Sequence, residues 1–121
     1  MTTTKAHLVE ALNIISALEV KDAAGALLPV SATIQLFFVW AHEEGVALKV
    51  LRAFTRTSGA NITCLADRWV RLGYVDRSPD SADRRSYILT ALPFLADQFD
   101  AECKRLALTR RDLTLDERHG D

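Results

Sequence analysis

The segment from residue 59 to residue 72 limits the fold more than any other part of the chain, because its side chains divide into two faces. One face is apolar and repeats at the spacing of a helix: Ile62, Leu65, Trp69 and Leu72. The neighbouring face is polar and partly basic: Asn61, Cys64, Arg68 and Arg71. Such a helix needs a hydrophobic core on one side and leaves a polar surface on the other.

Three helices are predicted before this segment. The first covers about residues 4–23 and carries one apolar stripe. The second covers residues 32–44, with Ser31 as its N-cap, and is apolar on most sides. The third is short and covers residues 47–55, after which Ser58 is the expected N-cap of the two-faced helix.

A β-hairpin and a last helix are predicted after the two-faced helix. Two strand-like runs at residues 74–77 and 86–90 flank the turn signal Pro79-Asp80-Ser81. Pro93 stands at the position that proline favours in the first turn of a helix. We expect this helix to cover residues 93–110.

These elements predict a mostly α fold with a small β-hairpin, in the α+β class. The chain of 121 residues is long enough to bury one core, so a single domain over residues 1–121 is expected. A helix-turn-helix followed by a two-stranded hairpin is the winged helix-turn-helix arrangement, and it covers residues 31–92 here. The helices at 4–25 and 93–110 flank this core.

Positive charge is concentrated in the middle of the chain. The whole sequence has 15 Lys/Arg and 16 Asp/Glu, a net charge of −1 that by itself argues against binding of nucleic acid. Residues 49–87, however, carry eight Lys/Arg against four Asp, a net charge of +4 within two acidic flanks. A basic segment in an acidic frame is typical of a local anion-binding surface, with chance clustering as the alternative.

The motif content of residues 60–87 resembles the signature region of the MarR-type transcription regulators. The run LADRWVRLGYVDR is followed within ten residues by DRR, before the last strand. The match runs through the following residues: Leu65, Asp67, Arg68, Gly73, Val75, Arg77, Asp83, Arg84 and Arg85. The chain departs from the family pattern at Arg52, which stands where alanine is usual.

The resemblance implies that the two-faced helix enters the major groove of DNA. Polar side chains near the N-terminus of such a helix read base edges. The expected contacts are Ser58, Asn61, Thr63, Cys64, Arg68 and Arg71. The alternatives are that Ser58 only caps the helix, that Asn61 is merely solvated, and that Cys64 is either a redox sensor or an ordinary exposed thiol.

The resemblance also assigns roles to the hairpin. Asp83 is expected to brace it by pairing with an arginine, and Arg77 is either that partner or a phosphate contact. Arg84 or Arg85 is expected to enter the minor groove, whose narrow regions attract arginine electrostatically. A solvated, charged hairpin without such a role is the alternative.

A homodimer on a palindromic operator is a further implication of the resemblance. The first and last helices would pair across a two-fold axis. The candidate interface residues are Leu8, Leu12, Ile15, Leu95, Phe99 and Leu106. The alternative is that both apolar stripes pack on their own domain. A small-molecule ligand of unknown identity that regulates the protein also follows from the resemblance alone.

No catalytic, metal or cofactor site is expected. The three histidines lack metal-ligand spacing among themselves or with the two cysteines, and no phosphate loop or Ser/His/Asp grouping is present in the sequence. The two cysteines lie far apart and share no motif, so a cytoplasmic protein is expected. The apolar run at residues 26–41 is interrupted by polar residues and proline, so no membrane span is expected.

The sequence therefore predicts a dimeric, sequence-specific DNA-binding transcription regulator, a repressor, whose partner is double-stranded DNA. The alternative is a winged-helix module that binds a protein component of transcription rather than DNA.

Overall fold

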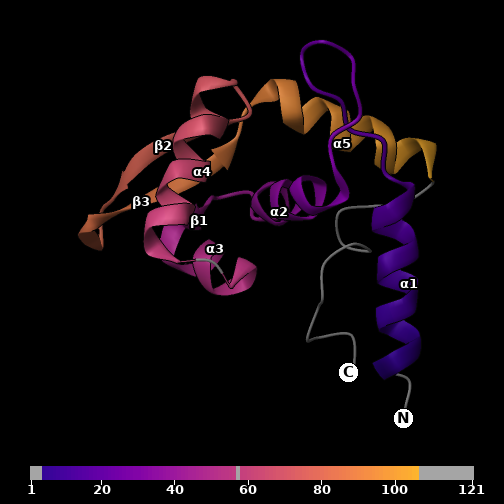
Figure 1. Ribbon diagram of the computed structural model, residues 1–121, viewed down its shortest axis with the longest axis horizontal. Coiled ribbons are helices and arrows are strands. Elements are labelled where there is room, and N and C mark those ends of the chain that lie inside the picture. Colours follow the sequence, from indigo (N-terminus) through magenta and orange to yellow (C-terminus); the bar gives the residue numbers. More distant parts are fainter. Residues whose placement is uncertain (1–3, 57, 107–121) are drawn as a thin grey trace.

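The structure of the chain is a computed structural model, and it describes residues 4–56 and 58–106. Five helices and three short strands are present in this part of the chain, in the order shown in Figure 1. They are α1 (Thr4–Ala17), α2 (Val30–Ala41), β1 (Val46–Ala47), α3 (Leu48–Thr55), α4 (Gly59–Arg71), β2 (Val75–Asp80), β3 (Asp83–Ala91) and α5 (Pro93–Arg105). This confirms the predicted fold class, a mostly α winged helix with a small antiparallel sheet.

The sheet contains one strand more than the predicted hairpin. Its order is β1-β3-β2, and both pairs are antiparallel. The hairpin turns at residues 81–82, later than predicted, because Pro79 still pairs with Tyr87 at the point where the register shifts. Strand β2 lies at the edge of the sheet, where the missing N–H of a proline is tolerated.

The join between α2 and β1 requires a glycine. Gly45 has a φ of +95°, and a Cβ atom there would collide with the side chains of Ile88 and Thr90 on β3. The backbone therefore approaches β3 closely, which brings β1 into the sheet and places α3 against it.

The core lies around α2, which Figure 1 shows in the middle of the molecule, with α5 across one side. Its largest fully buried side chains come from six elements and the segment after α1: Phe99, Leu36, Leu51, Ile62, Leu89, Leu95, Val20, Val39 and Val75. The ring of Trp40 stacks on that of Phe99, with centroids 5.1 Å apart. In the described residues, no helix is both long and apolar enough to cross a membrane.

The first two helices differ from their predicted bounds. Helix α1 ends at Ala17, and the chain then runs extended, with a bridge between Lys21 and Leu27. Helix α2 begins at Val30 because Pro29 serves as its N-cap and accepts the backbone N–H of Thr33 at 2.9 Å. The predicted cap at Ser31 is therefore wrong, and that residue lies inside the first turn of α2.

Candidate nucleic-acid interface

Helix α4 begins with a side-chain cap. The hydroxyl oxygen of Ser58 accepts the backbone N–H of Asn61 at 3.2 Å, which confirms the predicted N-cap. The hydroxyl of Thr63 donates to the carbonyl of Gly59 at 3.0 Å. Both hydroxyls are thus engaged with the backbone of the first turn.

The two faces of α4 lie as their spacing predicts. Ile62 and Trp69 are buried in the core, and Leu65 packs at its edge. The polar stripe is exposed along its whole length: Asn61, Cys64, Arg68 and Arg71. Leu72 departs from the prediction and is 50% exposed, because it is the C-cap residue and the chain turns away there.

A charged pair joins α4 to the hairpin. The Nη1 atom of Arg77 on β2 donates to the Oδ1 atom of Asp67 on α4. The guanidinium carbon of Arg77 also lies 5.1 Å from the ring centroid of Tyr87, on the opposite strand. Arg77 therefore contacts both helix α4 and the neighbouring strand, and we call the Asp67–Arg77 pair the brace.

The predicted brace between Asp83 and Arg77 is wrong. Asp83 lies opposite Asp80, three residues along β2 from Arg77, and Arg77 lies opposite Leu89. At about 3.3 Å per residue the two positions are about 10 Å apart along the strand. The carboxylate of Asp83 instead accepts the backbone N–H of Arg85 at 3.0 Å, so it shapes the end of the hairpin.

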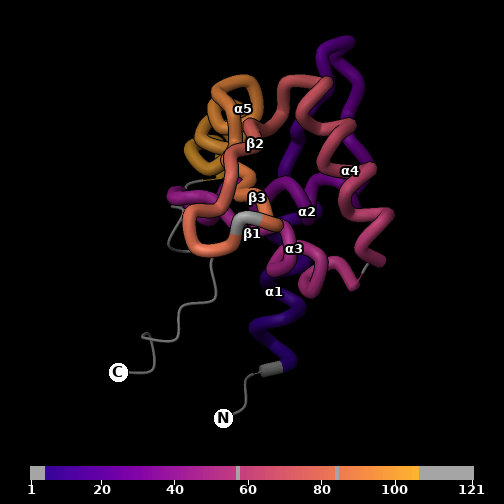
Figure 2. Tube along the Cα trace, turned by 90° about the vertical axis from the view of Figure 1, so that its left-hand side faces the viewer, coloured from indigo at the N-terminus to yellow at the C-terminus, as the bar shows by residue number. Residues whose placement is uncertain are grey.

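The tip of the hairpin presents Arg85, which is exposed. The side chain of Arg84, the other predicted minor-groove residue, lies outside the part of the chain that the structure describes. Figure 2 shows that the hairpin tip and the N-terminal end of α4 point in the same direction. The N-terminal end of α4 and the hairpin tip thus lie on the same side of the winged-helix unit.

No functional role was predicted for Arg52, which departs from the family pattern. It is exposed, and its Nη1 atom would lie 3.6 Å from a Cβ atom at Gly59. The guanidinium group therefore lies beside the first turn of α4. The signal for this placement was the helix–turn–helix spacing, which brings one turn of α3 next to the start of α4.

The residues predicted for a dimer interface divide into two groups. Leu8 and Leu12 on α1 are 55% and 57% exposed, whereas Ile15 is half-buried. Leu95 and Phe99 are fully buried in the chain's own core, which corrects their assignment to an interface, because they have no surface left for a partner.

Leu106, the last predicted interface residue, packs at the edge of the same core. Residues 107–110 of the predicted last helix lie outside the described residues.

Within residues 4–56 and 58–106, no three His, Cys, Asp or Glu side chains are placed to hold a metal ion. Of the two cysteines, Cys64 is exposed and Cys103 is buried.

Comparisons with known proteins identify the fold. No protein-family model matches the sequence, and neither does any curated protein. Among solved structures, the chain is similar to overoxidized AbfR bound to DNA, with a TM-score of 0.53 and 16% identity over 85% of this chain and 71% of that one. It is also similar to the S. aureus MepR–DNA complex, with a TM-score of 0.56 and 14% identity over 88% of this chain and 81% of that one.

A third similar structure is heme-free PefR, with a TM-score of 0.51 and 14% identity over 85% of each chain. All three are MarR-family regulators, so the resemblance predicted from the motif is confirmed at the level of the fold. The chain has the winged-helix fold of these proteins.

Proposed function

We propose that the chain is a sequence-specific DNA-binding transcription regulator, a repressor that acts in the cytoplasm as a homodimer on a palindromic operator. The observation that carries the proposal is the exposed polar stripe of α4, held beside the hairpin by the brace. Two structures with the same fold, AbfR and MepR, are complexes with DNA, which supports the proposal.

Helix α4 would read the major groove. Its exposed Asn61 has the donor and acceptor pair that matches adenine, and Arg68 has the two-pronged donor that matches guanine or a phosphate. The hydroxyl of Ser58 is engaged in capping, so it would contribute chiefly by fixing the first turn. Base recognition would therefore depend on Asn61 and Arg68, with Arg71 near the backbone of the DNA.

The hairpin would act as the wing. Arg85 at the tip is free to reach a narrow minor groove, where the negative potential favours arginine. The brace fixes the hairpin relative to α4, because Arg77 bonds directly to a residue of that helix. Helix and wing would then meet DNA in one geometry, which reduces the entropy lost on binding.

The dimer would form through α1. Leu8, Val9 and Leu12 are each more than half exposed, although a soluble monomer usually covers such a cluster. A second copy related by a two-fold axis would bury both clusters and place two recognition helices about one helical turn of DNA apart.

The proposal is tested by selecting bound duplexes from random DNA and then measuring affinity by gel shift. Asn61→Ala should chiefly relax sequence preference, and Arg85→Ala should weaken binding to every duplex. Lys104→Ala is a matched control, since it removes an exposed positive charge from α5, away from α4 and the wing. Binding should also weaken steeply with salt, because phosphate contacts release counterions.

The alternative is a module that binds a protein component of transcription through four aromatic residues, Phe37, Phe38, Trp40 and Trp69. Phe37, Trp40 and Trp69 are buried in the core, whereas Phe38 is half-buried, so these aromatic residues offer little contact surface. An absence of DNA binding at low salt would overturn the DNA-binding proposal and return attention to this alternative.

A further inference from the structure

Helix α1 is attached to the rest of the molecule in an unusual way. It projects from the body (Figure 1), and three of its apolar side chains are more than half exposed. The chain after it, residues 18–21, is extended rather than helical. The direction in which α1 points therefore depends on how this short segment is held, together with the contacts of α1 with α2 and the packing of Ile15 on the core.

The segment is anchored to the core by alternate side chains. Leu18 and Val20 are 7% and 1% exposed, whereas Glu19 and Lys21 point to the surface. This alternation is that of a strand. One edge of its main chain pairs with residues 27–28, where the backbone N–H of Leu28 donates to the carbonyl of Val20 at 2.8 Å, and the other edge faces α5.

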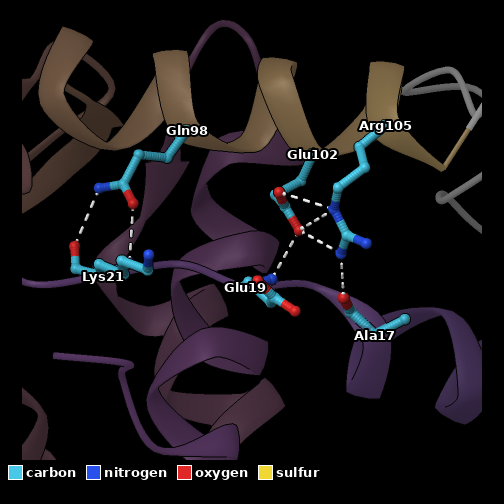
Figure 3. Close-up of polar contacts among 6 residues, drawn as sticks. All are labelled: Ala17, Glu19, Lys21, Gln98, Glu102 and Arg105. Atoms are coloured by element: carbon cyan, nitrogen blue, oxygen red, sulfur yellow. Dashed lines mark hydrogen bonds and ion pairs between the residues drawn. The ribbon is translucent and has the colours of Figure 1, made fainter. Parts of the chain in front are cut away.

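At the edge that faces α5, Gln98 takes the place of a second neighbouring strand (Figure 3). Its Oε1 atom accepts the backbone N–H of Lys21 at 2.7 Å, and its Nε2 atom donates to the carbonyl of the same residue at 2.9 Å. A side-chain amide has the donor and acceptor of a peptide group, so Gln98 reproduces the paired bonds of an antiparallel ladder.

One and two turns further along α5, two charged side chains hold the rest of the segment. The Oε1 atom of Glu102 accepts the backbone N–H of Glu19 at 2.7 Å. The Nη2 atom of Arg105 donates to the carbonyl of Ala17 at 2.6 Å and also to Glu102 at 2.7 Å.

Arg105 also acts at the end of α1. Ala17 is the last residue of that helix, so its carbonyl has no partner within the helix. A guanidinium there both satisfies the carbonyl and complements the negative end of the helix dipole.

We propose that Gln98, Glu102 and Arg105 are positioning residues that fix the angle of α1 and so select the half-site spacing of the operator. We call the three residues the clamp. The proposal rests on the proposed function, since the angle of α1 sets the separation of the two recognition helices only in a dimer on DNA.

A small change of angle is enough to matter. Helix α1 has 14 residues and is therefore about 21 Å long. A tilt of roughly 10° about its C-terminal end would move its far end by about 4 Å, close to the rise of one base pair, ~3.4 Å. Loss of the clamp should therefore be visible at the resolution of single base pairs.

The first experiment measures spacing preference with the full chain. Palindromes built from the selected half-site, with one or two base pairs inserted or removed at the centre, are titrated with wild type, with Gln98→Ala/Arg105→Ala, and with Asp97→Ala as a control on the exposed neighbour of Gln98. Wild type and control should prefer one spacing by at least tenfold. The double variant should bind the neighbouring spacings within about threefold, and an unchanged preference would overturn the proposal.

The second experiment reads the angle without DNA. A spin label on the exposed Cys64 of α4 and one on Asn13→Cys of α1 report the distance between the two parts, with buried Cys103 protected from the label. An excess of unlabelled protein restricts the signal to distances within one chain. The distribution should broaden in Gln98→Ala/Arg105→Ala and stay narrow in Asp97→Ala.

The two experiments fail in distinguishable ways. An equally narrow distribution in the double variant would overturn the clamp itself, whatever DNA does. A broadened distribution in a protein whose wild type binds no DNA at low salt would instead overturn the proposed function, and with it the selection of spacing.

Discussion

Polar side chains hold two parts of the molecule in place: the hairpin against α4, and the base of α1 against α5. The two sets of side chains bond to different kinds of partner. In the winged-helix unit, the brace joins one side chain to another, Arg77 to Asp67. At the base of α1, the clamp joins side chains to main-chain atoms of Ala17, Glu19 and Lys21. Truncation of either Asp67 or Arg77 would remove the brace. The clamp can be removed by truncating its side chains on α5, but not by truncating the side chains of the residues whose main chain it holds.

The apolar stripes of α1 and α5 differ as well. Both α1 and α5 carry an apolar stripe, yet that of α5 is buried in the core and that of α1 is exposed. Phe99→Ala should therefore lower the free energy of unfolding by about 3–5 kcal/mol, the usual cost of removing a buried ring. Urea denaturation measures it.

Leu12→Asp is the matched change on α1. It should leave the unfolding of the monomer nearly unchanged while lowering the mass in solution from that of a dimer to that of a monomer. Equal losses of stability in the two variants would mean that the two stripes do not differ as described.

The clamp should contribute more to stability than the brace. Gln98→Ala removes two bonds to the main chain of Lys21 and leaves its N–H and carbonyl to find water. We expect a loss of about 1–2 kcal/mol, at about 1 kcal/mol for each bond. Thermal or urea unfolding of this variant beside Asp97→Ala gives the comparison, and equal stability of the two would contradict it.

The brace should matter for DNA more than for stability. Asp67 and Arg77 keep 42% and 30% of their side-chain surfaces exposed, so breaking the pair should cost under about 1 kcal/mol of folding free energy. Asp67→Asn should nevertheless raise the dissociation constant for DNA by about tenfold, equivalent to ~1.4 kcal/mol. Asp76→Asn, a change at an exposed aspartate, is the control. Equal affinities of the two variants in a gel shift would show that the brace does not contribute to DNA binding.

The smallest expected effect is a pH dependence of the stability that Glu102 contributes through the clamp. The hydrogen bond from Arg105, helped by the N–H of Glu19 and the charge of Lys21, holds the pKa of Glu102 below its ordinary value. A depressed carboxyl pKa contributes stability that is fully present above the ordinary glutamate value and is lost as the pH falls through the folded value.

The advantage of wild type over Glu102→Gln should therefore be constant near neutral pH and shrink in acid. Urea unfolding of both proteins across a pH series measures it. A difference that does not change with pH would show that the charge of Glu102 contributes nothing to the clamp.

Local signals in the sequence were enough to predict α4 and the hairpin. The apolar spacing of Ile62 and Trp69, the cap at Ser58 and the glycine after the helix all act within a few residues of one another. The register of the hairpin was not predictable in the same way, and Asp83 was consequently assigned the partner that Asp67 has in the structure.

The base of α1 shows why the rest of the fold was harder to predict. Leu18 continues the helical spacing of Ile15, so the apolar stripe by itself predicts that the helix continues past Ala17. The alternation of buried Leu18 and Val20 instead indicates an extended chain. An apolar stripe also predicts burial without saying by what, which is how Leu95 and Phe99 came to be assigned to an interface. The clamp itself leaves no pattern, because its partners are peptide groups that every residue possesses.

Because the clamp bonds to peptide groups rather than to side chains, the segment after α1 should tolerate changes of sequence. Glu19 and Lys21 meet α5 through their backbone N–H groups, so many other side chains could stand at both positions without altering the bonds. Proline is the exception, because it has no N–H to offer. Among proteins descended from the same ancestor, we would expect these two positions to drift freely and to avoid one amino acid.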